Sequence, residues 1–168
     1  MKLLLDTNII IDAKSAEILD YINCNEFSVS SVVLKEEVLK QVTNFNYSLL
    51  NIIKETYLEL ELAMTFYEVN KGISFYNALN TAIAKERKFT LVTGDQKLIK
   101  FAKNIGVDCI GIIKLLELMI NESLISPLQC VEGLKKLIND PSRRIPINLV
   151  NNFIEKIKDY YFIKEEIK

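Results

Sequence analysis

The sequence predicts an α/β fold: a doubly wound parallel sheet of four or five short strands flanked by helices, followed by a helical C-terminal extension. Short apolar runs alternate with helical patterns as far as residue 111, which is typical of parallel strands joined by crossover helices. No strand pattern returns after Ile112. We therefore expect an α/β domain at 1–111 and a helical extension at 112–168 that packs on it.

Four apolar runs predict the strands. Leu3–Leu5 is too short for a helix and stops at polar residues, as expected of a strand buried on both faces of a parallel sheet. The other three runs are FSVS at 27–30, FTLVT at 89–93 and VDCIG at 107–111.

Apolar residues at helical spacing predict the helices. Ser30 or Ser31, and later Ser74, supply side chains that cap the helices following them. The stretch 47–69 is interpreted as one long amphipathic helix or a pair. The helical patterns cover 9–24, 32–42, 47–69, 75–83, 95–104, 112–122, 127–139 and 146–160.

Composition excludes several kinds of chemistry. The 168 residues contain no histidine, so Ser-His-Asp and Cys-His catalysis and histidine-ligated metals are excluded. Carboxylates must carry any acid, base or metal chemistry. The formal net charge of -1 does not indicate a nucleic-acid binder, so such binding would depend on a local basic patch.

Three cysteines, Cys24, Cys109 and Cys130, are odd in number and lack C-x-x-C spacing, which argues against a disulfide framework and a zinc site. A reducing, cytoplasmic setting fits this pattern. The apolar run at the N-terminus is too short for a signal sequence, and no apolar stretch is long enough to cross a membrane.

Acidic residues follow three of the predicted strands. Asp6 comes directly after Leu3–Leu5, Glu36 or Glu37 lies in the helix after the second strand, and Asp95 follows LVT. Because ligands of open α/β sheets gather at the carboxyl ends of the strands, we expect these side chains to meet there. Each also has a simpler explanation: a turn or helix cap for Asp6 and Asp95, and a surface pair with Lys40 for Glu36.

Four stretches resemble the PIN domains, a family of metal-dependent ribonucleases that includes the VapC-type toxins of toxin-antitoxin systems. They are LLLDTNIIIDA, VSSVVLKEEV, ISFYNALNTAIAKE and FTLVTGDQKLIKFAKNIGV, in the order and spacing of that family over residues 1 to about 111. The tail, with SRRIPINLVNNFIEKI, resembles the helical C-terminal extension of one PIN subgroup.

The resemblance implies a site for Mg²⁺ or Mn²⁺. The implied metal ligands are Asp6, Glu36 and Asp95, and the implied orienting residues are Asn8 and Thr93. The register of the glutamate is open between Glu36 and Glu37, and we choose Glu36. A hard cation of this kind takes carboxylate oxygens and waters and leaves positions for a phosphate oxygen.

One residue departs from the family pattern. PIN domains usually have an aspartate at the start of the fourth helix, where this chain has Asn77 in NALNTAIA. An amide oxygen can ligate a cation but brings no charge, so we include Asn77 as a metal ligand and expect weaker metal binding. The simpler explanation is that Asn77 is only a polar residue in the first turn after Ser74.

The resemblance therefore implies a Mg²⁺- or Mn²⁺-dependent endoribonuclease, the toxin of a toxin-antitoxin pair. Its partners would be RNA, a small antitoxin protein and a second copy in a homodimer. Six basic and two acidic residues lie between Lys85 and Lys103, and among them Lys97 and Lys100 are expected to bind substrate.

Two other hypotheses remain beside this one. Asn77 favours a PIN scaffold that binds RNA or protein with weakened or no cleavage. A haloacid-dehalogenase-type phosphatase also places an aspartate after its first strand, but it requires D-x-D where this chain has Asp6-Thr7-Asn8. A dinucleotide-binding enzyme is disfavoured because no G-x-G-x-x-G follows the first strand.

Overall fold

The computed structural model describes residues 2–22, 26–43, 46–143 and 145–159. The chain divides into two compact units. The sheet unit comprises residues 1–11 and 22–112, and the helical unit comprises residues 12–21 and 113–168. The helical unit thus includes 12–21, which the sequence analysis assigned to the α/β domain. That the two parts are separate domains stays a prediction.

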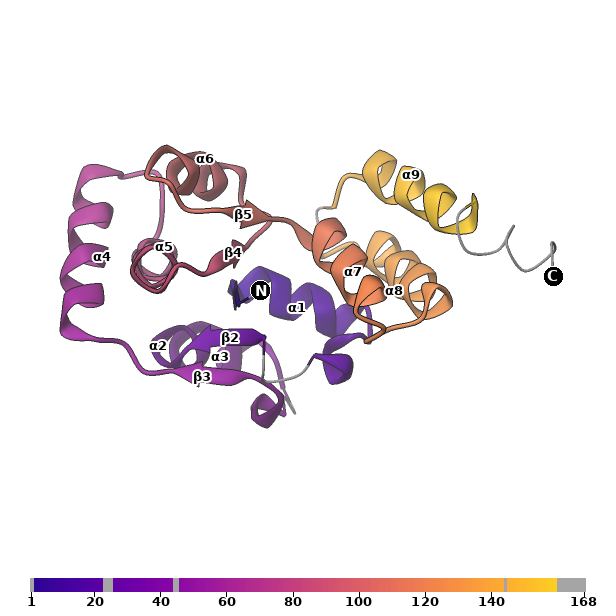
Figure 1. The fold of residues 1–168 in the computed structure, drawn as a ribbon, viewed down its shortest axis with the longest axis horizontal. Helices are drawn as coiled ribbons and strands as arrows, with labels where there is room; N and C mark the ends of the chain where they lie inside the picture. The colour runs from indigo at the N-terminus through magenta and orange to yellow at the C-terminus, as the bar shows by residue number, and fades with distance from the viewer. Residues whose placement is uncertain (1, 23–25, 44–45, 144, 160–168) are drawn as a thin grey trace. The chain divides into compact units, whose positions relative to one another are not determined.

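Five parallel strands form one sheet in the order β3-β2-β1-β4-β5. The strands are β1 (Leu3–Leu5), β2 (Phe27–Ser30), β3 (Asn51–Ile53), β4 (Thr90–Val92) and β5 (Cys109–Ile110). Leu4 of β1 pairs with Ser28 on one side and Leu91 on the other. Since helices flank this sheet, the predicted α/β fold class is confirmed (Figure 1).

Strand order reverses at β1. From this central strand the chain runs outward to β2 and β3, then returns to the other side of β1 to form β4 and β5. The carboxyl ends of β1 and β4 are therefore adjacent at the point where open α/β sheets bind their ligands. Asp6 follows β1, and Thr93 follows β4.

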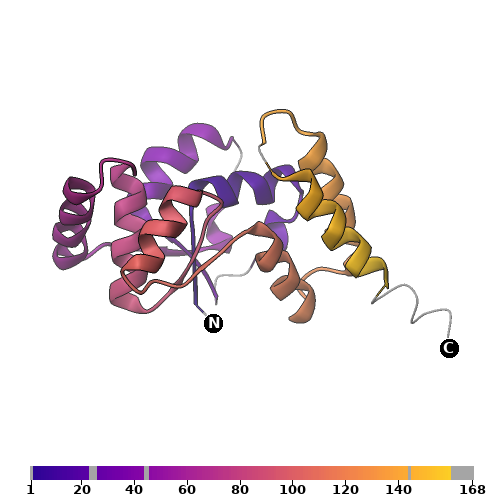
Figure 2. The ribbon, with the colours of Figure 1, turned by 90° about the horizontal axis from the view of Figure 1, so that it is seen from above.

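Short sequence signals set the helix boundaries of the sheet unit. Ser74 caps α5 through the Asn77 N–H, and Thr56 and Glu59 cap each other's backbone at the start of α4. Figures 1 and 2 both show α4 beside α5, and these two helices are in extensive contact. The helical elements that precede β5 are α1 (Thr7–Ser15), η1 (Leu19–Tyr21), α2 (Ser31–Val33), η2 (Leu34–Val38), α3 (Leu39–Gln41), η3 (Tyr47–Leu49), α4 (Tyr57–Val69), α5 (Phe75–Arg87) and α6 (Gln96–Asn104), of which η1 and the end of α1 belong to the helical unit.

The structure corrects two of the predicted helices. The stretch 47–69 contains η3 and strand β3 before α4 begins at Tyr57, so the helix prediction was wrong for 51–53. The predicted helix 9–24 ends at Ser15, because Glu17 takes a left-handed backbone with φ of 57°. Residues 23 and 24 of that prediction lie outside the described residues.

In the described part of the chain after Gly111, the helices are α7 (Ile112–Asn121), α8 (Pro127–Asn139) and α9 (Ile147–Ile157). Ser126 and Gln129 form a capping box at the start of α8, which agrees with the predicted helix 127–139. Within the helical unit, α8 approaches residue 16 so closely that a Cβ on Gly133 would lie 2.8 Å from the Ala16 carbonyl oxygen. Residue 160, the end of the last predicted helix, is not among the described residues.

An ion pair joins distant parts of the helical unit. Arg143 Nε lies 2.7 Å from Asp12 Oδ1, and both side chains are largely shielded from solvent. Burial raises the pKa of Asp12 in spite of the opposing charge of Arg143. Among the helices of the described residues, none has the length and apolar character needed to span a membrane.

Candidate active site

Asp6 lies at the rim of the central strand and is only 2% exposed. Its Oδ1 accepts a hydrogen bond from the Thr7 N–H at 2.8 Å, and its Oδ2 accepts one from the Thr93 hydroxyl at 2.8 Å. The Asp6 N–H donates to the Val92 carbonyl of the neighbouring strand at 3.0 Å. Both the backbone and the carboxylate of Asp6 are therefore held in place.

The environment of Asp6 disfavours its charged form. Burial raises the pKa of Asp6 from 3.8 to about 6, and the nearby charges of Glu37 and Asp95 contribute in the same direction. Hydrogen bonds from Thr93 and Thr7 act in the opposite direction. A group with this pKa changes protonation near neutral pH, which is common among residues of functional sites.

Glu37, and not Glu36, lies next to Asp6. The Thr7 hydroxyl donates to Glu37 Oε2 at 2.6 Å, so that Thr7 contacts both carboxylates. Glu36 is exposed and forms an ion pair with Lys40 at 2.6 Å; the hydrogen bond from Lys40 lowers the pKa of Glu36. These contacts favour Glu37 over our choice of Glu36 as the candidate metal ligand.

The helix that carries Glu37 is locally widened. Residues 34–38 form a π-helical turn, in which the Leu39 N–H donates to the carbonyl of Leu34 five residues earlier. Both glutamates lie inside this turn, and such turns often occur at functional sites. The sequence left the register open, and the contact of Thr7 with Glu37 Oε2 is the observation that separates the two glutamates.

Glu55 fixes the start of the helix that carries Glu37. After β3, its carboxylate accepts hydrogen bonds from the hydroxyls of Ser30 and Ser31, the latter at 2.7 Å, and from the Val32 N–H at 3.1 Å. Burial alone would raise the pKa of Glu55, but these hydrogen bonds hold it below its usual value. This residue was missed at the sequence level because β3 was not predicted.

Asp95 connects the site to α5 and α6. It is the N-cap of α6, with Oδ1 accepting from the Lys97 and Leu98 N–H groups at 2.8 and 3.2 Å. The Asp95 N–H donates to the Thr93 hydroxyl at 3.2 Å, and the Asn77 amide donates to Asp95 Oδ2 at 3.3 Å. Capping thus accounts for one oxygen of Asp95, while the other faces Asn77.

Hydrogen bonds connect six of these residues into one series. It runs Glu37, Thr7, Asp6, Thr93, Asp95, Asn77, and its members come from four separate parts of the sheet unit. We use the name acidic cluster for Asp6, Glu37 and Asp95. Asn8 is exposed in the first turn of α1, and in the part of the chain that the structure describes no hydrogen bond connects it to this series. Thr7 makes the contacts that we expected of Asn8.

The series lies at the switch point of a parallel α/β sheet, and the family comparison agrees with that architecture. A family model described as a PIN domain matches residues 2–159. The chain belongs to the PIN domain family. A comparison with curated proteins gave no match. Membership of this family indicates a nuclease-type function in general.

In this PIN domain the match extends beyond the sheet. Residues 2–159 include α7, α8 and α9, whereas the stretches that carry the resemblance in the sequence end near residue 111. The VapC-type subgroup and the status of the helices as a subgroup extension stay predictions.

The acidic cluster offers carboxylate oxygens, which are donors of the kind that a divalent cation binds. Carboxylate oxygens prefer Mg²⁺ and Mn²⁺, and a cation would offset the mutual repulsion that helps to raise the pKa of Asp6. Among the described residues, however, no three acidic or cysteine side chains lie close enough together to hold one ion. This arrangement fits Mg²⁺ bound through one or two carboxylates with several waters retained, and does not fit a closed protein cage.

The basic residues near this PIN site differ in their contacts. Lys97 and Lys100 are exposed on α6, which Asp95 caps. Arg87 instead donates to Glu59, with Nε 2.6 Å from Oε1 and Nη2 2.9 Å from Oε2, and to the Lys54 carbonyl. Of the six basic residues between Lys85 and Lys103, Arg87 thus serves the fold.

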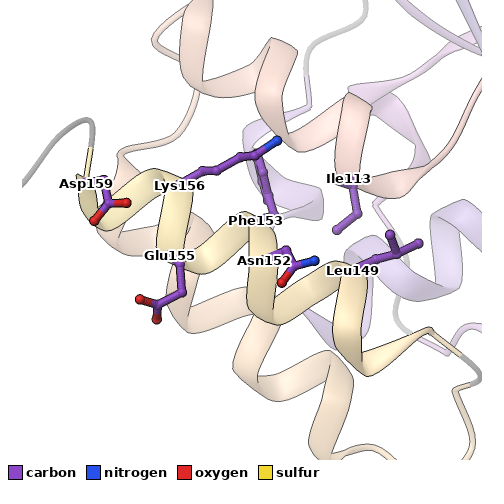
Figure 3. Close-up of a pocket in the computed structure, with 7 residues that line it drawn as sticks. All are labelled: Ile113, Leu149, Asn152, Phe153, Glu155, Lys156 and Asp159. Atoms are coloured by element: carbon purple, nitrogen blue, oxygen red, sulfur yellow. The ribbon is translucent and has the colours of Figure 1, made fainter.

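A separate groove lies in the helical unit, between α7 and α9 (Figure 3). None of the residues predicted for the site lines it. Its lining carries both charges and no cluster of like-charged groups: Ile113, Leu149, Asn152, Phe153, Glu155, Lys156 and Asp159.

Two of the three cysteines fall in the described residues, and both are free thiols. Burial raises the pKa of Cys109 to about 11 and that of Cys130 to about 12. Neither thiol is ionised near neutral pH, so neither is a nucleophile for this site.

Proposed function

We propose that this PIN domain is a Mg²⁺- or Mn²⁺-dependent endoribonuclease that hydrolyses RNA phosphodiester bonds at the acidic cluster. The observation that carries the proposal is the buried Asp6 carboxylate, which two hydroxyl-bearing residues connect to Glu37 and Asp95. Without histidine in the chain, carboxylates are the groups left to supply acid, base and metal-binding chemistry.

One or two of the carboxylates of Asp6, Glu37 and Asp95 would bind the ion directly, and the remaining acidic groups and the Asn77 amide would bind it through retained waters. When bound, a divalent cation lowers the pKa of water and offsets the charge that develops on the phosphate oxygens. Thr93 and Thr7 keep the Asp6 carboxylate in one orientation through their hydrogen bonds at 2.8 Å. Such fixed placement is what a catalytic constellation requires.

The remaining roles in the proposal concern partners. Lys97 and Lys100 would attract the RNA backbone, because they are exposed on the helix that Asp95 caps. A small antitoxin, a homodimer and a cytoplasmic location complete the toxin hypothesis. They are supported by the family resemblance and by the cysteine pattern alone.

An RNA cleavage assay tests this proposal. We expect a labelled single-stranded RNA to be cleaved with Mn²⁺ or Mg²⁺ and to stay intact in EDTA. The variants Asp6→Asn and Asp95→Asn should each reduce the rate by about 100-fold or more, since each removes a proposed ligand. Cleavage that persists in EDTA, or in both variants, would refute the proposal.

A second candidate is a PIN scaffold that binds RNA or protein without cutting. It is favoured by the Asn77 amide, which occupies the position of the usual aspartate and donates to Asp95 Oδ2 at 3.3 Å. The variant Asn77→Asp distinguishes the two. A scaffold should gain Mn²⁺ binding and cleavage from this change, whereas a wild type that already cleaves as fast as Asn77→Asp excludes the scaffold.

A further inference from the structure

Three aromatic side chains of α4 and α5 make successive edge-on contacts, and one of them directly precedes Asn77 in the chain. Phe75 and Tyr76 occupy the first turn of α5, directly before Asn77, and Tyr67 lies near the end of α4. The ring centroids of Tyr76 and Phe75 are 6.0 Å apart, and those of Phe75 and Tyr67 are 6.2 Å apart. We use the name aromatic track for Tyr67, Phe75 and Tyr76.

The aromatic track reaches the surface, unlike the aromatic pair next to it. Tyr67 is 39% exposed, and Phe75 and Tyr76 are half-buried. By contrast Phe66, the neighbour of Tyr67 in sequence, is 7% exposed and packs edge-on against Phe101 at 5.4 Å. Core packing therefore accounts for Phe66, and Phe75 packs partly against the same core, but the exposed ring surfaces of Tyr67 and Tyr76 have no such explanation.

A lysine accompanies each end of the track. The Lys71 ammonium lies 5.8 Å from the centroid of the Tyr67 ring. At the other end, the pKa of Lys40 is raised first by its hydrogen bond to Glu36 and, to a smaller extent, by the nearby phenol of Tyr76. The Lys40–Glu36 pair is exposed on both sides, so Lys40 can exchange Glu36 for another anion at little cost.

We infer that the aromatic track, with Lys40 and Lys71, binds single-stranded RNA and leads it to the acidic cluster. Unstacked bases pack against aromatic side chains, while ammonium groups meet the phosphates. Bases of a duplex are already stacked and paired, so a duplex cannot use such a track. The inference rests on the proposed function for its ligand. Because Tyr76 directly precedes Asn77, we place the Tyr76 end of the track nearest to the acidic cluster.

Binding of single-stranded RNA in EDTA tests this inference separately from cleavage. The probe is a fluorescein-labelled oligouridine, measured by fluorescence anisotropy with the full chain. We expect Tyr67→Ala and Tyr76→Leu each to raise Kd about fivefold or more, because each removes a stacking surface. Tyr67→Phe and Tyr76→Phe retain the rings and should bind as the wild type does.

Tyr57→Ala is the matched control, since Tyr57 is also a tyrosine of α4, is 77% exposed and lies outside the track. Its Kd should stay within about twofold of the wild type, as for other exposed positions without contacts. Lys71→Gln should reduce the salt dependence of binding, lowering the slope of log Kd against log salt by about 0.7.

The results separate the two proposals. Track variants that weaken RNA binding, in a protein that does not cleave, support the track and refute the nuclease. Metal-dependent cleavage with an unchanged Kd in Tyr67→Ala and Tyr76→Leu supports the nuclease and overturns the track. The track is also overturned if these substitutions weaken the binding of duplex RNA as much as that of single-stranded RNA. A change in the sedimentation coefficient of the track variants without RNA would overturn it too, because it would mark a protein interface.

Discussion

Thr93 donates a hydrogen bond of 2.8 Å to Asp6 across 87 positions of sequence, and it accepts one from the Asp95 N–H. This single hydroxyl connects the ends of two adjacent strands, β1 and β4, at the point where strand order reverses. Together with the Thr7 N–H, this contact fixes the orientation of the buried Asp6 carboxylate. Its charge has consequences that can be measured.

The first prediction concerns pH. Because the folded pKa of Asp6 is raised from 3.8 to about 6, the folded state binds the Asp6 proton more tightly than the unfolded state does. In EDTA, the contribution of Asp6 to the free energy of unfolding is therefore fully present below about pH 4 and is lost as the pH rises through about 6. Relative to wild type, Asp6→Asn should gain up to about 3 kcal/mol of unfolding free energy over this interval.

Denaturant unfolding of both proteins between pH 4 and pH 7 measures this difference. Adding Mn²⁺ at pH 7 should stabilise the wild type and leave Asp6→Asn unchanged, because a cation favours the charged carboxylate. Parallel stability curves for the two proteins across this range would contradict the raised pKa.

The second prediction separates two adjacent glutamates. Glu37→Gln should lower the rate of cleavage by about tenfold or more, because Glu37 belongs to the acidic cluster and accepts a hydrogen bond from the Thr7 hydroxyl. Glu36→Gln should change the rate by no more than about twofold, since Glu36 forms an exposed pair with Lys40. Initial rates at saturating Mn²⁺ compare the variants, and the reverse order would restore Glu36 as the ligand.

The third prediction concerns an ion pair that serves stability. The Glu59 side chain is 3% exposed and both of its oxygens accept from Arg87, so Arg87→Met leaves a buried charge without its cation. We expect a loss of about 2 to 3 kcal/mol in the free energy of unfolding. Lys40→Met is the control, because it breaks an exposed pair and should cost less than about 1 kcal/mol. Equal losses would argue against this role of Arg87.

The fourth prediction reverses the usual effect of a helical glycine. Replacing glycine by alanine inside a helix normally stabilises it by about 1 kcal/mol. In Gly133→Ala the new Cβ would meet the Ala16 carbonyl oxygen at 2.8 Å, and that backbone cannot move aside cheaply. We expect a net loss of about 1 to 3 kcal/mol. Glu132→Ala, on the exposed side of α8, controls for the change in helix propensity, and a thermal melt that shows Gly133→Ala to be stabilised would refute the close packing.

Much of the sheet unit could be predicted because its signals are local. Leu3–Leu5 followed by Asp6 indicates a buried strand with a polar rim, and Ser74 is the cap of α5 as expected. Strand β3 was missed because it has three residues, two of them exposed, and because Ile52 and Ile53 also fit a helical spacing. The capping box that begins α4 at Thr56 was the local signal that could have separated strand from helix.

The site was harder to predict than the fold because its register depends on non-local contacts. Asp6, Thr93 and Asp95 come after strands, so the strand ends place them. The choice of Glu37 depends on its contact with Thr7, which lies 30 positions away in the sequence.

Anomalous diffraction from crystals soaked in Mn²⁺ would decide whether the acidic cluster binds a divalent cation. We predict one manganese peak at the carboxyl end of β1 and β4, with oxygens of Asp6 and at least one of Glu37 and Asp95 at about 2.0–2.6 Å or bridged by water. No peak at this position at millimolar Mn²⁺, or a peak bound only by residues outside the acidic cluster, would contradict the proposed metal site.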